Sequence, residues 1–291
     1  MMNPEPYPFI TILMPIYNGI EFMKESVASV FAQQGLSPSM WELIIGINGH
    51  PKNSPTYIEA NEIVRKLRLI FVNGMDFQVS IIDLYDLTIK GKSAALNKMV
   101  NSYTNLQSNW IALLDVDDVW HPHKLMTQIK FLIPIKEMNT SIMYPAYDVV
   151  GSQSIYFGTD AGKKDGLSPE IPVGNLSGFD FLKVNPIINS SVIIRKKYAI
   201  WNSAEDGVED YDLWLSLKLR NCLFYNCPEK LIRHRLHNSS AFNSSKGGNN
   251  NKVIALKQKY VSQFRENIHT HSSTICNNIM KCLLHRHTNS S

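Results

Sequence analysis

The chain passes from a charge-free apolar run into three carboxylates within the segment Trp110-Ile111-Ala112-Leu113-Leu114-Asp115-Val116-Asp117-Asp118-Val119-Trp120. The run from Trp110 to Leu114 predicts a short strand that is buried on both faces of a parallel sheet. Ligands of open α/β sheets bind beyond the carboxyl ends of the strands, so Asp115 and Asp117 stand at the expected place for a ligand site.

Carboxylates this close together repel one another unless a cation or strong hydrogen-bond donors neutralise them. Hard oxygen ligands at a strand end suit Mg²⁺ or Mn²⁺, which makes a divalent cation the first hypothesis. The competing interpretation is a solvated turn followed by a helix N-cap. The flanks favour the ligand site, because a buried strand precedes the acids and Pro122 suits the first turn of a helix that continues to about Leu132.

Strand and helix patterns alternate along the rest of the chain, which predicts an α/β fold with a mostly parallel, Rossmann-like central sheet and flanking helices. Strands are predicted from Phe9 to the break at Pro15 and over Trp41–Ile47, Val79–Leu84, Ile142–Val150, Ile155–Gly158 and Pro186–Arg195. Helices are predicted after Gly19, over Ile58–Leu69, from Gly91 through Val100, near Phe179 and in the acidic segment that begins at Glu205. The first strand is not followed by Gly-x-Gly-x-x-Gly, and the chain has no Gly-x-x-x-x-Gly-Lys-Ser/Thr motif. These absences argue against an NAD-type loop and a P-loop.

A second group of acids, which includes Glu209 and Asp210, opens the helix predicted in the segment after Glu205. Negative charge in the first turn is favourable for a helix, so these acids either serve a site or stabilise the helix. The sequence leaves both interpretations open. The next extended segment ends in Arg233-His234-Arg235-Leu236-His237, which places cations near a region already rich in carboxylates.

Composition and length are those of an ordinary globular chain, with 44% hydrophobic and 19% charged residues among 291. This length is enough for one large or two ordinary domains. No apolar run is long enough to span a membrane, and the first eight residues lack the features of a signal peptide. The cysteines are therefore expected to be reduced thiols, and a cytoplasmic location is predicted.

The last part of the chain differs from the rest. Residues 1–240 are predicted to form one domain, and residues 241–291 a flexible loop followed by a basic helical tail. From Lys230 to Ser291 there are ten Lys or Arg residues, against the single acid Glu266. Solvated helix faces are the commoner explanation for such charge, and contact with an anionic membrane surface is the alternative. No specific nucleic-acid binding is expected.

Five ordered motifs resemble glycosyltransferase family 2, whose members have the GT-A fold, over roughly Phe9 to Ser240. The motifs are Met14-Pro15-Ile16-Tyr17-Asn18-Gly19, Glu42-Leu43-Ile44-Ile45, Gly91-Lys92-Ser93-Ala94-Ala95-Leu96-Asn97, Leu114-Asp115-Val116-Asp117-Asp118-Val119-Trp120 and Glu209-Asp210-Tyr211-Asp212-Leu213-Trp214. The resemblance implies a metal-dependent enzyme that moves a sugar from a nucleotide-diphosphate sugar to an acceptor hydroxyl with inversion. A UDP-sugar is the favoured donor, and the acceptor is a glycan, a protein or a lipid-linked molecule.

The resemblance also implies roles for individual residues. Asp115 and Asp117 correspond to the Asp-x-Asp motif that binds Mn²⁺ or Mg²⁺ with the donor diphosphate, and His237 joins them as a metal ligand. Asp210 corresponds to the catalytic base, with Glu209 beside it. The implied donor-binding residues are Pro15, Tyr17, Asn18, Asn48, Lys92, Asn97, Asp115, Asp117 and Arg235.

One position departs from the family pattern. Most members have two aspartates after the second strand, where this chain has Ile47-Asn48. The second position usually accepts a hydrogen bond from the nucleotide base. An asparagine amide both accepts and donates, so Asn48 is expected to alter the preference for uracil over other bases.

Two other classes of protein also fit parts of the sequence. Haloacid-dehalogenase-like phosphatases carry Asp-x-Asp-x-Thr/Val after an apolar strand, and there Asp115 would be a nucleophile. That motif normally opens its domain, whereas here an ordered α/β pattern precedes it. The third interpretation is a non-catalytic binding protein with the GT-A fold, against which the retained Asp115, Asp117 and Asp210 argue.

Overall fold

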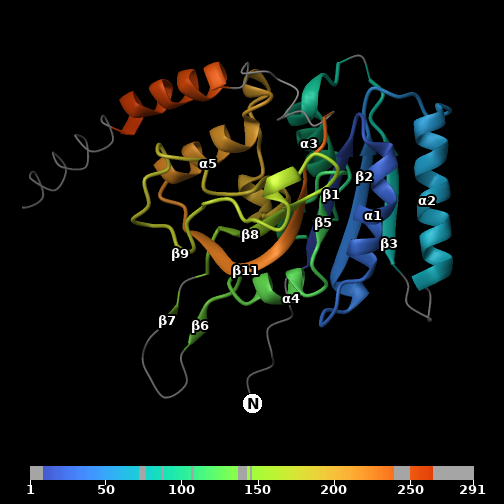
Figure 1. Ribbon diagram of the computed structural model, residues 1–291, viewed down its shortest axis with the longest axis horizontal. Coiled ribbons are helices and arrows are strands. Elements are labelled where there is room, and N and C mark those ends of the chain that lie inside the picture. Colours follow the sequence, from blue (N-terminus) through green and yellow to red (C-terminus); the bar gives the residue numbers. More distant parts are fainter. Residues whose placement is uncertain are drawn as a thin grey trace, which may run out of the picture.

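The computed structural model describes residues 9–71, 77–86, 88–105, 108–136, 143–144, 146–238 and 250–264. These residues build a curled nine-stranded sheet with helices on both faces, and a separate two-stranded ribbon (Figure 1). The strand order in the large sheet is β3-β2-β1-β4-β10-β8-β11-β5, with β9 beside β11.

The first half of the sheet is parallel, as predicted. Its strands are β1 (Ile10–Ile16), β2 (Trp41–Ile47), β3 (Gln78–Asp83) and β4 (Trp110–Leu113). The helices that connect them are α1 (Ile20–Phe31), α2 (Pro55–Phe71) and α3 (Gly91–Ser102). Strands β1, β2 and β4 are almost wholly buried, because helices cover both of their faces.

The second half of the sheet is mixed, so the predicted mostly parallel sheet is wholly parallel only over β3, β2, β1 and β4. Strand β10 runs antiparallel to both β4 and β8, while β11 is parallel to β8 and antiparallel to β5 and β9. A parallel neighbour needs a long crossover, usually a helix. Among the described residues between β4 and β10, the only α-helix is the six-residue α4, so this part of the chain lacks such crossovers. The strands are β5 (Val119–Trp120), β8 (Val149–Phe157), β9 (Gly174–Asn175), β10 (Ile193–Arg195) and β11 (Phe224–Arg235), and the ribbon is β6 (Ile135–Lys136) with β7 (Met143–Tyr144).

Several predicted elements in this half are wrong or shorter. The segment around Phe179 forms turns, not a helix. The predicted strand Pro186–Arg195 is interrupted by a 3-10 turn at Asn189–Ser191, and only Ile193–Arg195 pairs as strand. The remaining helices are α4 (Lys124–Ile129), α5 (Glu209–Leu219) and 3-10 turns η1 (Pro38–Met40), η2 (Gly162–Lys164), η3 (Asn189–Ser191), η4 (Lys196–Tyr198) and η5 (Ser203–Glu205).

Two apolar cores lie on opposite faces of the sheet. Side chains alternate between the faces along β1, so that Ile12 and Met14 join the core under α1 and α2, while Leu13 joins the core under α3 and α5. Helix α5 is buried almost all round, and Tyr211, Trp214 and Leu217 are all buried. The first turn of α5 is therefore held firmly against the sheet.

Residues 250–264 form a further helix on the α5 side (Figure 1). Leu256 and Tyr260 are buried in the same core as α5. The Tyr260 hydroxyl lies 2.9 Å from Asp212 Oδ1, and Lys259 Nζ lies 3.0 Å from the same oxygen. Residues 241–249 of the predicted flexible loop and the tail beyond residue 264 lie outside the described residues.

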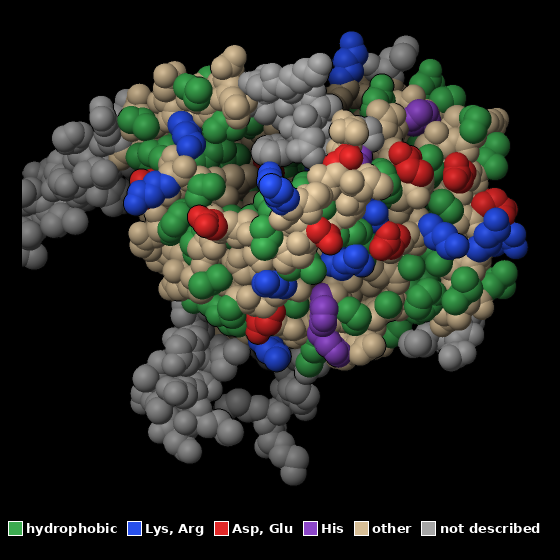
Figure 2. All heavy atoms as spheres, in the orientation of Figure 1, with side chains coloured by type: hydrophobic (Ala, Val, Ile, Leu, Met, Phe, Trp, Pro, Cys, Tyr) green, Lys and Arg blue, Asp and Glu red, His purple; other side chains and the backbone are tan. Residues whose placement is uncertain are grey.

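The described surface carries mixed charge. Figure 2 shows basic and acidic side chains interspersed on one face, in keeping with the modest net charge of +4. No helix among the described residues is long and apolar enough to cross a membrane. Cys222 and Cys227 are buried free thiols, and the other two cysteines lie in the undescribed tail.

Candidate active site

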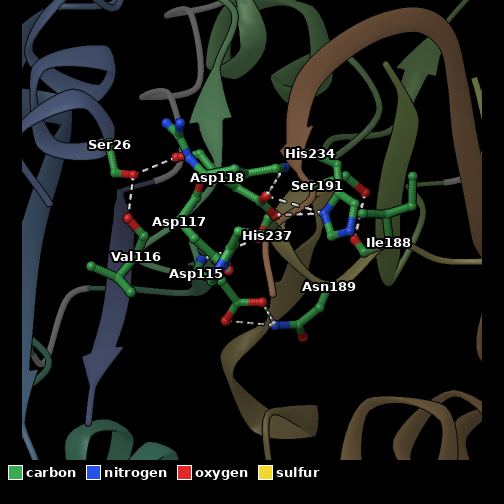
Figure 3. Close-up of polar contacts among 12 residues, drawn as sticks. Ser26, Asp115, Val116, Asp117, Asp118, Ile188, Asn189, Ser191, His234 and His237 are labelled. Carbon is green, nitrogen blue, oxygen red and sulfur yellow. Dashed lines mark hydrogen bonds and ion pairs between the residues drawn. The ribbon is translucent and has the colours of Figure 1, made fainter. Parts of the chain in front are cut away.

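The carboxyl ends of β1, β2 and β4 meet at one edge of the sheet, as parallel strands require. The chain leaves the sheet after Leu113 and turns at once, with Asp118 N donating to Asp115 O at 3.1 Å. Helix α1 fixes this turn, because Ser26 Oγ lies 2.6 Å from Val116 O and 2.5 Å from Asp118 O (Figure 3). The acidic turn is therefore a rigid part of the fold.

Each of the three carboxylates in this turn has its own partner, which offsets part of their mutual repulsion. Asp115 Oδ1 lies 2.6 Å from Lys92 Nζ, at the start of α3. The Asn189 amide also donates to Asp115, at 3.1 and 3.3 Å to its two oxygens (Figure 3). Burial alone would raise the pKa of Asp115, but the Lys92 ammonium and Asn189 outweigh it and lower that pKa below its usual value.

Asp118 is the most deeply buried of the three. Its carboxylate accepts the Arg235 backbone N–H at 3.0 Å and lies 3.1 Å from His234 Nδ1. Burial alone would lower the pKa of His234, but contact with Asp118 raises it to about 9. His234 is therefore a cation at neutral pH, and this pair anchors the end of β11 to the acidic turn.

Asp117 meets the last residue of the predicted basic motif. Asp117 Oδ2 lies 2.9 Å from His237 Nε2, and the His237 ring packs 4.6 Å from the ring of Phe22. Burial and the neighbouring acids Asp118 and Asp115 raise the pKa of Asp117. Of the three acids in the turn, Asp117 is the one whose charge is least neutralised by the protein.

Arg235 closes this end of the site. Its Nε donates to Asp117 O at 2.8 Å, and its guanidinium carbon lies 4.8 Å from the ring centroid of Phe22 and 4.3 Å from that of Phe157. It also forms an ion pair with Glu25 on α1. In this arrangement Arg235 supports the backbone of the acidic turn.

The second group of acids lies at the start of α5. The two Asp210 oxygens accept from Tyr211 N at 2.7 Å and from Asn185 Nδ2 at 2.9 Å. Burial and the adjacent Glu209 raise the pKa of Asp210 to about 6, although Asn185 and Lys92 act in the opposite direction. At neutral pH Asp210 is thus mainly ionised, with a proton affinity well above that of an exposed aspartate.

Lys92 connects the two acidic groups. Its Nζ lies 2.6 Å from Asp115 Oδ1 and 3.8 Å from Glu209 Oε1. Burial opposes the charge of Lys92, but Asp115 and Glu209 raise its pKa above the usual value. Glu209 is held further by Gly207, whose N–H donates to Oε2 at 2.6 Å. The strand-end acids and the helix-start acids therefore belong to one site.

The start of α3 is occupied by a residue that the sequence analysis did not single out. Asp206 Oδ1 accepts from Ser93 N at 3.0 Å and from Ser93 Oγ at 2.5 Å. A Cβ at Gly91 would lie 1.5 Å from Asp206 Oδ2, and Gly91 has a φ of +83°. Only glycine fits here, because both the close approach and the left-handed backbone exclude a side chain.

The remaining residues predicted to bind the nucleotide-sugar lie at the same edge of the sheet or beside it. Asn48 is buried, with its N–H 2.7 Å from Ile16 O and its Nδ2 3.4 Å from Gly91 O. Tyr17 is 62% exposed, and Asn18 beside it is also exposed, so both are open to a ligand. Pro15 pairs with Gly46 near the end of β1. Their roles in donor binding stay predictions.

Asn97 has a different environment from the other residues predicted to bind the nucleotide-sugar. Its Nδ2 donates to Trp201 O at 2.7 Å, and its Oδ1 accepts from Trp201 N at 2.9 Å. Both functions of the amide are thereby used to hold the segment that leads to Asp206. A direct contact between Asn97 and a donor stays a prediction.

Sequence reasoning missed Asn185 and Asn189, which touch Asp210 and Asp115 respectively. Both lie in the segment predicted as part of a strand or just before it. The available signal was the pair of amides spaced four residues apart around Pro186, since polar groups that interrupt an apolar run need partners. Asp206 was also missed, because it lies in a cluster of acids and the sequence does not tell which acid accepts from which hydrogen-bond donor.

The side chains around Asp117 offer oxygen and nitrogen ligands that suit a divalent cation arriving with a diphosphate. Two carboxylates and an imidazole are ordinary ligands for Mn²⁺, and such cations complete their coordination with substrate phosphates and water. No group of three or more His, Cys, Asp or Glu side chains within the described ranges is arranged to hold a metal by itself. The residues fit a shared cation better than an all-protein metal centre, since Lys92 already occupies one Asp115 oxygen.

Residues 11–151 match the family model described as glycosyl transferase family 2. Over these residues, just under half of the chain, the sequence is similar to this family. The match spans β1 to β4 and the acidic turn, and it decides against the phosphatase interpretation, in which Asp115 would be a nucleophile.

Curated relatives with glycosyltransferase names cover most of the chain. An uncharacterised glycosyltransferase of Rickettsia felis is 27% identical over 84% of this chain, but the match spans only 36% of that relative. The chain thus spans about a third of the length of the first relatives it matches. Two bacterial relatives match over most of their own length. WfgD of Escherichia coli is 27% identical over 89% of this chain and 87% of its own, and TuaG of Bacillus subtilis is 24% identical over 92% and 93%.

Solved structures establish the fold as GT-A. The mannosyltransferase PcManGT of Pyrobaculum calidifontis superposes with a TM-score of 0.56 at 12% identity, over 82% of this chain and 60% of its own. TarS of S. aureus superposes with a TM-score of 0.52 at 13% identity, over 87% of this chain and 65% of its own. At these identities the likeness concerns the fold alone.

Proposed function

We propose that this chain is a metal-dependent glycosyltransferase that moves a sugar from a nucleotide-diphosphate sugar, with a UDP-sugar favoured, to an acceptor hydroxyl with inversion. The observation that carries the proposal is the position of Lys92 between Asp115 and Glu209, which unites a strand-end acid with the acids at the start of α5. A transfer of this kind needs a place for the donor diphosphate and a base for the acceptor within one site.

The names of the similar proteins support a nucleotide-sugar donor. WfgD is named a UDP-Glc:alpha-D-GlcNAc-diphosphoundecaprenol beta-1,3-glucosyltransferase. PcManGT was solved in complex with GDP-Man and Mn²⁺, and TarS with UDP. The acceptor of the present chain is proposed only as a class: a hydroxyl of a glycan, a protein or a lipid-linked molecule.

Asp210 is the proposed base. As the acceptor oxygen bonds to the anomeric carbon, the bond from that carbon to the nucleotide diphosphate breaks and the hydroxyl proton passes to an Asp210 oxygen. A pKa of about 6 suits this role, because the group is mainly ionised at neutral pH and yet binds a proton more strongly than an exposed aspartate. Glu209 does not compete for the role in this geometry, since it is held by Gly207 and Lys92.

Asp117 and His237 are the proposed protein ligands of Mn²⁺ or Mg²⁺, with Asp115 beside them. When bound, such a cation neutralises charge that develops on the departing diphosphate. Lys92 holds Asp115 in place from the α3 side, and Arg235 holds the Asp117 backbone from β11. Asn48 is proposed to face the nucleotide base at the end of β2.

The proposal is tested by donor binding and by turnover. Purified chain is titrated with UDP, GDP, UDP-Glc and GDP-Man, with Mn²⁺ or with EDTA, while thermal stability is followed. A bound ligand stabilises the fold by about 2.7 kcal/mol at 100 times its dissociation constant. Stabilisation that needs both nucleotide and cation is expected, and equal stabilisation in EDTA contradicts the role of the metal.

Turnover separates an enzyme from a binding protein of the same fold. Release of UDP or GDP from each donor, with water or added sugars as acceptor, is expected to depend on Asp210 and Asp117. Glu62→Gln is the matched control for loss of an acid, because Glu62 lies on α2 and is paired with Arg65 in an exposed position. Tight metal-dependent binding without release from any donor supports the non-catalytic interpretation.

A further inference from the structure

Asn185 is the side-chain amide that holds Asp210. Asp210 Oδ1 is taken by Tyr211 N, its own helix neighbour, and Oδ2 accepts from Asn185 Nδ2 at 2.9 Å. We propose that Asn185 is a positioning residue that keeps the Asp210 carboxylate aimed and ionised for proton acceptance. This inference rests on the proposed role of Asp210 as the base.

The segment around Asn185 is built to hold that amide still. Asn185 Oδ1 accepts from Ile187 N at 3.3 Å, which orients the amide so that its N–H₂ faces Asp210. Pro186 O accepts from the buried Asn226 at 2.7 Å. Tyr211 of α5 donates its hydroxyl to Phe181 O at 2.5 Å, which ties the start of the same segment to the helix that carries Asp210.

The charged groups around Asp210 make this hydrogen bond important. Glu209 precedes it on α5, and its negative charge and the burial of the site both favour the protonated carboxyl. Lys92 on α3 favours the ionised form, but its shortest contact is with Asp115. Tyr211 is neutral at physiological pH, because burial raises its pKa to about 12. Among the described residues, Asn185 is thus the hydrogen-bond donor from outside α5 that contacts the Asp210 carboxylate directly.

Asn189 acts on the other acid from the same segment. It lies four residues after Asn185, and its amide donates to both oxygens of Asp115. The η3 turn between Ile188 and Val192 presents Asn189 to the acidic turn, while Ser190 Oγ accepts from Asp115 N at 3.1 Å. One short segment therefore contacts both groups of acids, and Asn185 is its contact on the side of the base.

The test replaces the hydrogen-bond donor of the Asn185 side chain without changing the size or shape of that side chain. Asn185→Asp keeps the oxygen that accepts from Ile187 N but places a carboxylate oxygen where the N–H₂ stood. Two facing carboxylates favour sharing a proton, so the pKa of the pair rises. Asn185→Ala removes the donor without adding charge and serves as the second variant. Asn61→Asp, on the exposed side of α2, adds the same charge far from the site.

The first readout does not depend on activity. The carboxyl carbon of Asp210 is followed by NMR titration in protein labelled with ¹³C-aspartate, and Asp210→Asn identifies its signal. The midpoint is expected near pH 6 in the unsubstituted chain. It should move up by about one pH unit or more in Asn185→Asp, less far in Asn185→Ala, and not at all in Asn61→Asp. An unmoved midpoint in both Asn185 variants overturns the inference.

The second readout is the pH profile of kcat for sugar transfer. Its acid limb should follow the NMR midpoint upward in both variants, with kcat recovered at alkaline pH and KM for the donor little changed. A residue that only supports the fold would lower kcat at every pH without moving the limb. If the NMR midpoint moves but the limb does not, Asn185 tunes Asp210 and the proposed base is wrong, so the two failures are distinguishable.

Discussion

Lys92 Nζ lies 2.6 Å from Asp115 Oδ1 and at the same time 3.8 Å from Glu209 Oε1, so that one ammonium serves acids from two different elements. About a third of the Lys92 side chain is exposed. Water therefore screens the pair, and its direct contribution to the free energy of unfolding is about 1 kcal/mol at most. Its larger effect is on the charge state of the acids around it.

Lys92→Met should change the protonation of Asp210 more than the stability of the fold. The lysine charge favours the ionised form of Asp210, so its loss raises that pKa above the present value of about 6. The acid limb of the kcat profile is expected to move to higher pH, and donor affinity to fall because Asp115 loses its fixed partner. Denaturant unfolding of the same variant checks that the loss of stability stays near 1 kcal/mol.

Asp117 and Asp210 should differ in what their loss does to binding and to rate. Asp117→Ala removes a proposed metal ligand used in both ground and transition states, so donor affinity and turnover are both expected to fall. Asp210→Asn keeps the shape and should leave donor affinity nearly intact while the transfer rate drops about 10²- to 10⁴-fold.

Donor titration and single-turnover transfer on the same preparations measure both quantities. Asp210 is the second residue of α5 and asparagine has nearly the same size and shape, so Asp210→Asn should not unfold α5. Near-normal turnover of Asp210→Asn would remove this residue from the mechanism and leave it as a stabiliser of the helix.

Asn48→Asp should shift the preference among nucleotide bases toward uracil and thymine. Asn48 is buried at the end of β2 and its amide lies 3.4 Å from Gly91 O, so a carboxylate there would only accept hydrogen bonds from a base. Competition among UDP, dTDP, GDP and CDP in a thermal-shift assay ranks the bases. An unchanged ranking means that Asn48 does not contact the base.

Lys124 should make the stability of the fold depend on pH. The side chain is fully buried, with Nζ 2.7 Å from Gln128 Oε1 and 4.0 Å from the centroid of the Trp120 ring. No carboxylate pairs with it among the residues that the structure describes. Burial lowers its pKa well below the usual value. The unfolded chain therefore binds a proton that the folded chain binds less readily, and the free energy of unfolding should rise with pH up to about 10.4.

Lys124→Met isolates this effect, because it keeps the volume and removes the ionisable group. Relative to the unsubstituted chain, the variant is expected to be most stabilised at low pH, with the difference shrinking as pH rises. Urea unfolding at about pH 6 and about pH 9 measures it. If the variant and the unsubstituted chain differ in free energy of unfolding by the same amount at both pH values, the buried lysine is protonated in the folded chain.

The parallel half of the sheet could be predicted because its signals are local. The apolar runs at Ile10–Ile16, Trp41–Ile47 and Trp110–Leu113 are buried on both faces, and the intervening helices carry their own periodicity. The position of Asp115 and Asp117 beyond a strand end followed directly. The mixed half was harder, since short antiparallel strands joined by turns carry weaker patterns, and the turn at Asn189 interrupts an otherwise strand-like run.

The sequence by itself therefore determined which acids stand at the strand end and at the helix start, because strand and helix periodicity place them without reference to the rest of the chain. Only the tertiary structure decided which partner each acid takes. Asp115 meets Lys92 from 23 positions away and Asn189 from 74, while Asp118 meets His234 from 116. These pairs form where the two halves of the sheet join, and burial requires every charge there to find a partner, which no local pattern can assign.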